Sequence, residues 1–191
     1  LRAHGYTGRI VSFEPLSSVH ARLVASARGD AGWRVAPRMA LGDTEGKIDI
    51  HVAGNSLSSS ILDMLPEHER AAPGSAFVGS ESVSLRRLDR VAPDYMAGAK
   101  SVLLKMDTQG YEDRVLKGAS GVLDKVTAIQ TELSLVPLYA RQPLFDEMRT
   151  TIEAMGYGLF AVFPGYVHEQ SGQTLQLDGF FLRRDMTPGN S

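Results

Sequence analysis

The chain has 191 residues, and 43% of them are hydrophobic, which is enough for one domain with a sizeable core. Its 20 basic residues nearly balance its 22 acidic ones, so charge gives no argument for nucleic acid or an anionic membrane as a partner. Because cysteine is absent, disulfides, thiolate metal sites and a cysteine nucleophile are excluded.

No apolar run approaches the roughly 20 residues that a membrane helix requires, and no basic-then-apolar leader opens the chain. We therefore expect a cytoplasmic protein. Leu1–Gly5 resembles the end of a helix, because its glycine stands where a helix C-cap favours one. We accordingly expect the chain to lack residues that precede Leu1.

Strand and helix patterns alternate along the N-terminal half. A short apolar run predicts a strand over residues 9–13, and apolar residues at 16, 19, 23 and 27 predict a helix over 16–28. Further strands are predicted over 33–41 and 47–52. Residues 55–82 are predicted to form a long loop with a short helix over 61–70, and loops of that length are often lids or binding elements.

The alternation continues to the C-terminus. Strands are predicted over 83–88, 101–106 and 127–133, with 101–106 as the strongest buried-strand signal, and helices over 111–123 and 144–155. Two closing strands, 158–163 and 179–182, suit an antiparallel hairpin. The order predicts an α/β fold, one domain over residues 1–191, with a mostly parallel sheet covered by helices.

Carboxylates stand at the ends of several predicted strands. Open parallel sheets bind ligands outside the carboxyl ends of their strands, and here these ends are Glu14, Leu41–Asp43, Asp107 and Glu132. Glu14 can accept hydrogen bonds from a ribose diol, or it can be a solvated strand end. The turn at 41–43 can hold an adenine ring or be an ordinary tight turn.

The segment 105–112 is the most informative in the chain. Asp107 ends a buried strand, so it can face a sulfonium, position a substrate hydroxyl or hold a metal. Lys105 is unusual inside an apolar strand, whereas Glu112 suits the first turn of a helix. Glu132 can bind substrate or a metal, or it can support another residue through a hydrogen bond.

Other polar residues give weaker signals. The five histidines show no metal-ligand spacing. His168 can be a general base, although a loop histidine is more often merely exposed, and Tyr111 and Tyr139 are equally ambiguous. Ser58–Ser60 has no acid or base at fixed spacing and no Gly-x-Ser-x-Gly occurs, which argues against a serine hydrolase.

The chain resembles the FkbM-type methyltransferases from about Ile10 to Leu182. The most specific part of the resemblance is Lys-x-Asp-x-Gln-Gly-x-Glu over residues 105–112. The supporting motifs are Phe13-Glu14-Pro15, Ala40-Leu41-Gly42-Asp43, Val115-Leu116, Gly118-Ala119, Glu132, Pro137-Leu138-Tyr139 and Asp178-Gly179-Phe180-Phe181.

The resemblance implies a Rossmann-like class I methyltransferase with a seven-stranded sheet that uses S-adenosylmethionine (SAM). It implies a cofactor site at Glu14, Pro15, Leu41, Gly42, Asp43 and Asp107, with Glu14 on the ribose and residues 41–43 near adenine. Gln109, Tyr111 and Glu132 are then candidates for binding the acceptor. The family's first strand and its Asp-x-Gly-Ala-type loop have no counterpart here, so we expect this chain to bind SAM poorly or not at all.

The implied reaction transfers a methyl group, usually to a hydroxyl of a sugar or natural product. Asp107 is the first candidate for orienting or deprotonating that hydroxyl, and His168 is the second. A route assisted by Mg²⁺ ranks lower because no dedicated ligand spacing occurs. The alternatives are an NAD-dependent Rossmann oxidoreductase and a non-catalytic binding domain. The expected partner is a small molecule, without nucleic acid or membrane, and a homo-oligomer is possible.

Overall fold

The protein is represented by a computed structural model, which describes residues 2–72 and 74–186. The described residues form nine strands, listed here in chain order: β1 (Ile10–Ser12), β2 (Trp33–Val35), β3 (Ala40–Leu41), β4 (Gly46–Ala53), β5 (Phe77–Arg86), β6 (Leu103–Met106), β7 (Ala128–Ser134), β8 (Tyr157–Pro164) and β9 (Gln176–Arg183). The helices are α1 (Ser17–Ala27), α2 (Pro66–Ala71), α3 (Leu88–Val91), α4 (Pro93–Met96), α5 (Glu112–Gly118) and α6 (Phe145–Ala154). Short 3₁₀ turns occupy Arg2–His4, Leu123–Lys125 and Arg184–Met186.

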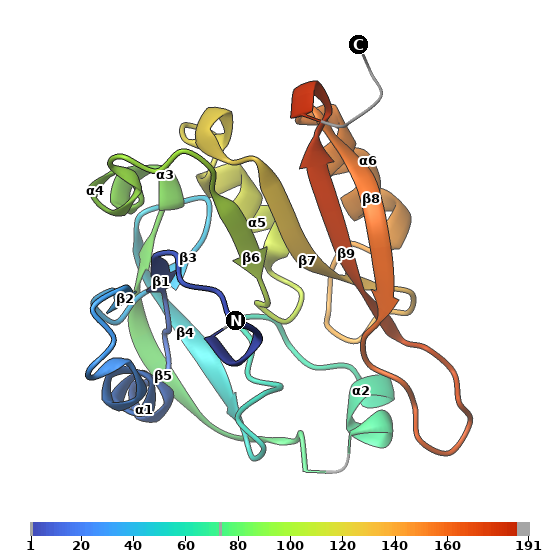
Figure 1. Cartoon of the computed structure of the whole chain (residues 1–191). Helices are drawn as coiled ribbons and strands as arrows, with labels where there is room; N and C mark the ends of the chain where they lie inside the picture. Colours follow the sequence, from blue (N-terminus) through green and yellow to red (C-terminus); the bar gives the residue numbers. More distant parts are fainter. Residues whose placement is uncertain (1, 73, 187–191) are drawn as a thin grey trace.

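The largest sheet has the strand order β6-β7-β9-β8 (Figure 1). β6 and β7 are parallel, whereas β9 runs antiparallel to both β7 and β8. Helices α5 and α6 bring Leu116 and Ile152 against Ile129, Leu133 and Phe181 of the sheet, and all five side chains are fully buried. The antiparallel C-terminal hairpin is therefore confirmed, and it completes the principal core.

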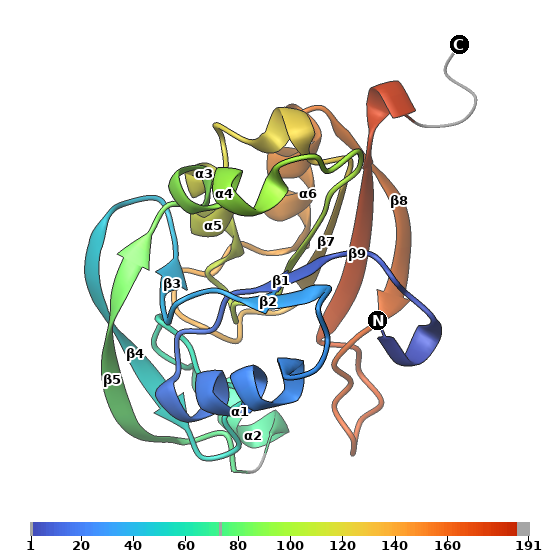
Figure 2. The same ribbon diagram turned by 60° about the vertical axis from the view of Figure 1, so that its left-hand side comes forward.

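β1 and β2 form a separate parallel pair, with α1 as the connection between them. Figure 2 shows this pair crossing in front of the larger sheet, with α1 beside it. A third sheet has the order β3-β5-β4, in which β5 is parallel to β3 and antiparallel to β4. The fold is thus mixed α/β, but the prediction of one mostly parallel, seven-stranded sheet is not confirmed.

Several predicted elements have different limits in the structure. The strand predicted over 33–41 is divided into β2 and β3, which lie in different sheets, because Pro37 between them has no N–H to give to a ladder. The loop predicted over 55–82 contains the first half of β5, and the short helix begins at Pro66 rather than at residue 61. Arg2–His4 is a 3₁₀ turn that ends before Gly5, where φ is 80°.

The strand predicted to be the most buried, β6, lies at the edge of its sheet. Leu103 is 46% exposed there, and Lys105 points to solvent. Both residues pair in register with β7 on the face opposite α5 and α6. The lysine inside an apolar strand is thereby explained, since its ammonium group stays in water. None of the helices in the described ranges is long and apolar enough to cross a membrane.

Helix α5 is packed directly against the turn that follows β3. A Cβ placed on Gly118 would lie 2.8 Å from the carbonyl carbon of Gly42 and closer still to its oxygen. Only a glycine therefore allows this approach between the two backbones. The contact joins the principal core to the third sheet, beside the cavity described next.

Candidate active site

One cavity of about 310 Å³ lies where the ends of β1, β3 and β6 approach each other. Its volume is at the lower end of the range for small-molecule sites. The walls are mostly apolar, with polar groups on the sides formed by β1, by the segment 56–61 and by the loop after β6. The principal lining residues are Phe13, Glu14, Pro15, Met39, Leu41, Ile50, Leu57, Ser60, Ile61, Asp107, Gln109 and Tyr111. Glu14 and Asp107, which are far apart in sequence, therefore face the same space.

Glu14 follows β1 directly, and Pro15 beside it also lines the cavity. One carboxylate oxygen of Glu14, Oε1, accepts a hydrogen bond of 2.8 Å from the backbone N–H of Leu16. Burial raises the pKa of Glu14 above its ordinary value, while this backbone hydrogen bond opposes the rise. The structure thus holds the carboxyl group half-buried at the rim of an apolar space.

The turn after β3 divides the predicted adenine site. Leu41 lines the cavity, whereas Gly42 and Asp43 do not. Gly42 lies under helix α5, and the Asp43 carboxylate pairs with the Arg114 guanidinium at 3.0 Å. Of the three predicted residues, only Leu41 faces the cavity, whereas Gly42 is engaged in packing and Asp43 in an ion pair.

Glu112 fixes the loop that carries Asp107. Its side chain is only 4% exposed, and its Oε1 accepts hydrogen bonds from the backbone N–H and hydroxyl of Thr108, at 2.8 and 3.0 Å. Burial raises the pKa of this carboxyl group. The glutamate interpreted from sequence as a partner of the helix dipole thus also clamps the loop between β6 and α5.

Gln109 connects Asp107 to Glu132. Its amide nitrogen donates to Asp107 Oδ1 and to Glu132 Oε2, each at 2.9 Å. Gln109 lines the cavity, whereas Glu132 lies behind it and does not. Desolvation raises the pKa of Glu132 to about 8, and the nearby carboxylates of Asp107, Glu112 and Asp178 act in the same direction. Lys105 opposes this rise.

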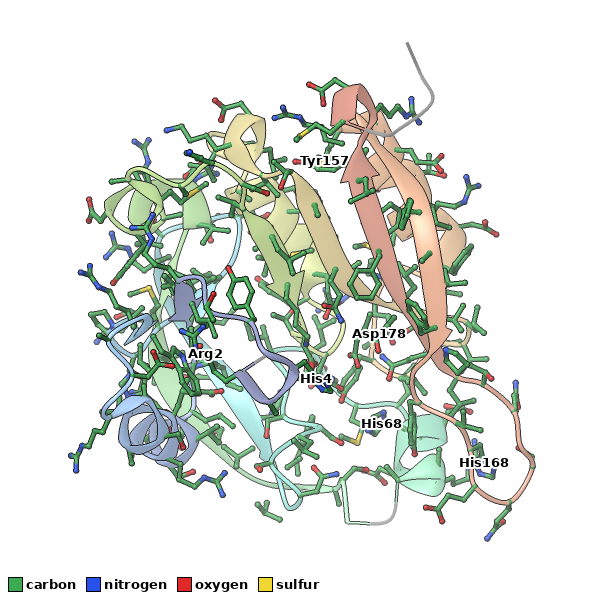
Figure 3. All side chains as sticks on the ribbon, in the orientation of Figure 1. Arg2, His4, His68, Tyr157, His168 and Asp178 are labelled. Carbon is green, nitrogen blue, oxygen red and sulfur yellow. The ribbon has the colours of Figure 1, made fainter. Side chains whose placement is uncertain are left out.

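Two further candidates occupy different positions. Tyr111 lines the cavity, and burial raises the pKa of its phenol, so that the hydroxyl stays protonated. His168 lies on the long loop between β8 and β9 (Figure 3), and it does not line the cavity. Its Nδ1 accepts a hydrogen bond of 3.2 Å from the backbone N–H of Ser171. The structure therefore does not bring His168 to Asp107.

Residues of the segment 55–82 and Tyr139 support Gln109, a role that the sequence analysis did not predict for them. The Ser60 hydroxyl donates to the Gln109 carbonyl at 2.7 Å, and the Tyr139 hydroxyl lies 3.0 Å from both Gln109 Oε1 and the Ser58 carbonyl. His68, 3% exposed, contacts the Ser58 hydroxyl through Nε2 at 3.0 Å. The run of three serines was the one sequence feature that could have indicated this group. The residues that bond to these serines are distant in sequence, so the contacts could not be predicted.

The described residues contain no group of three or more histidine, cysteine, aspartate or glutamate side chains placed to hold a metal ion. Asp107 and Glu132 face a shared amide donor instead.

In a comparison with known families, residues 1–159 match the methyltransferase FkbM domain. Neither the search of curated proteins nor that of solved structures found a match. The matched range includes β1 to β7 and every residue that lines the cavity. The chain therefore belongs to the FkbM methyltransferase family.

Proposed function

We propose that this FkbM-family chain is a SAM-dependent methyltransferase domain that methylates a hydroxyl oxygen of a small molecule, such as a sugar or natural product. The observation that carries the proposal is that Glu14 and Asp107 line one cavity. Membership in a methyltransferase family sets aside the alternative of an NAD-dependent oxidoreductase.

The residues of the cavity fit the nucleoside part of SAM. Glu14 uses Oε1 for the Leu16 N–H, which leaves its second oxygen available to accept a hydrogen bond from a ribose hydroxyl. Leu41, Ile50 and Ile61 supply apolar walls for a flat base. The carboxylate thus suits the ribose of a nucleoside, and the apolar walls suit its base.

Bound SAM would supply a methyl group on a sulfonium, an electrophile that needs little further activation. The residues of the protein then need to align the acceptor oxygen with the methyl group and to accept the proton of the acceptor hydroxyl. Asp107 is suited to both tasks because it lines the cavity and is fixed through Oδ1 by Gln109. Lys105 Nζ lies 3.4 Å from its other oxygen, which places a positive charge beside the carboxylate.

Nucleoside binding tests the proposal directly. We expect ligand-observed NMR to detect weak binding of SAM and S-adenosylhomocysteine, and calorimetry to give a dissociation constant weaker than micromolar. Glu14→Gln should weaken this binding about tenfold or more, since hydrogen bonds to charged groups contribute about 1.5–3 kcal/mol. Glu67→Gln, on the exposed surface of α2 and outside the cavity, is the matched control.

Equal affinity of the wild type and Glu14→Gln would contradict the assignment of the ribose site. Preferential binding of NAD over SAM and S-adenosylhomocysteine would contradict the proposed cofactor.

A further inference from the structure

The backbone at Gln109 is in the left-handed region, with φ of 53°, and Gly110 follows at 95°. A residue with a side chain at positive φ is uncommon, and strain of this kind costs about 1–3 kcal/mol where the surroundings sustain it. Here the hydrogen bond from Ser60 to the Gln109 carbonyl holds the turn. The strained turn directs the side chain of Gln109 between two strand ends.

The orientation of the Gln109 amide follows from its partners. Its NH₂ group donates hydrogen bonds to the carboxylates of Asp107 and Glu132, and its oxygen accepts a hydrogen bond from the Tyr139 hydroxyl. A reversed amide would turn the oxygen toward both carboxylates and would lose both hydrogen bonds. The structure therefore uses one side chain to join the acidic ends of β6 and β7.

The surroundings of the pair are acidic. The carboxylates of Glu112 on α5 and Asp178 on β9 raise the pKa of Glu132, whereas the Lys105 ammonium group lowers it. The Tyr139 phenol is also near Glu132, and burial raises the pKa of that phenol. Gln176 Nε2, at 3.4 Å, is a second and longer amide contact. Two carboxylates so close in a half-buried site rarely ionise together, and their titrations become coupled.

We propose that Gln109 is a positioning residue that ties Asp107 and Glu132 into one electrostatically coupled acid pair. Asp107 faces the cavity and Glu132 does not, so Asp107 is the member of the pair that meets the acceptor. This catalytic role rests on the proposed function, but the coupling between the two carboxyl groups does not.

A double-mutant cycle read by carbon NMR of the side-chain carboxyl groups tests the pairing. In the wild type we expect Glu132 to titrate at about 8. Asp107→Asn should lower that midpoint by about one pH unit or more, because a like charge is removed. In a Gln109→Gly background the same change should shift it much less, because an untied Asp107 turns toward Lys105 and solvent.

Gln109→Gly keeps the turn, since glycine accepts positive φ without strain. Arg141→Gly is the matched control: its φ is 61° in an exposed turn, so it relieves the same backbone strain without removing a hydrogen bond to Asp107 or Glu132, and the shift caused by Asp107→Asn should stay complete. If Gln109→Gly does not fold, Gln109→Asn replaces it, because asparagine tolerates this φ but is one methylene shorter.

Two results would overturn the proposal. One is a Glu132 midpoint in the ordinary range of carboxyl groups in the wild type. The other is an equal effect of Asp107→Asn with and without Gln109. Neither measurement requires a cofactor, so the pairing can fail while nucleoside binding succeeds, and the reverse also holds.

Discussion

Replacement of Gly118 by alanine tests the close approach between α5 and the turn after β3. Gly118 is the last residue of α5, and alanine in a helix is usually favoured over glycine by about 0.5–1 kcal/mol. In this position the new Cβ would lie 2.8 Å from the carbonyl carbon of Gly42. That contact is with backbone, which cannot rotate away as a side chain can.

The clash should outweigh the gain in helix propensity. Overpacking typically costs about 1–3 kcal/mol, and separation of the two backbones adds the packing that they lose. We expect a net destabilisation of at least about 1 kcal/mol, which for a domain of this size lowers Tm by at least about 2–4 °C. Thermal and urea unfolding followed by circular dichroism would measure it.

The control is Gly79→Ala in β5, where the position is exposed and no atom lies within 4 Å of an added Cβ. That variant should be as stable as the wild type or slightly more stable. If Gly118→Ala unfolds at the same temperature as the wild type, or at a higher one, the inferred contact between the backbones does not exist.

Three further predictions concern titratable groups. The folded-state pKa of Glu132 lies above its ordinary value, so its contribution to stability is complete below pH 4.5 and is lost as pH rises to about 8. Glu132→Gln should remove a pH dependence of at most about 1.4 kcal/mol per pH unit, measured by urea unfolding followed by circular dichroism, and identical pH profiles would refute this. Burial lowers the pKa of His68, so stability should fall as pH drops below 6.5; His68→Gln should abolish that fall, and an unchanged acid limb would argue against a buried neutral histidine. In the complete enzyme, Asp107→Asn should lower kcat for methyl transfer about 100-fold or more, and full activity would disprove its role as base.

The positions of the strands and helices along the chain were largely predictable, whereas the way these elements pair and pack against one another was not. The apolar run before Asp107 marks β6 correctly as a strand, but it cannot tell that the strand lies at an edge, with Leu103 46% exposed. Burial depends on which segment covers a face, and periodicity carries no information about that. The division of the segment 33–41 was in principle visible at Pro37, which interrupts any ladder.

The location of the cavity follows from the rule that ligands bind at the carboxyl ends of strands, which is why Glu14, Leu41 and Asp107 meet there. The connections of Gln109 could not be predicted in this way. They depend on a left-handed backbone at a residue other than glycine and on contacts with Ser60, Glu132 and Tyr139. The predicted role of His168 depended only on its residue type, and its loop lies elsewhere.

The small β1–β2 pair has a consequence for the order in which the molecule opens. No side chain within β1, α1 or β2 is buried, and the strands share no ladder with the other sheets. Amide protons there should exchange with deuterium well before those of β7, whose Ile129 and Leu133 are completely enclosed. Because Glu14 stands at the end of β1, a ligand bound to that carboxylate would slow amide exchange throughout β1, α1 and β2. Protection of these amides would therefore report ligand binding without any methyl transfer.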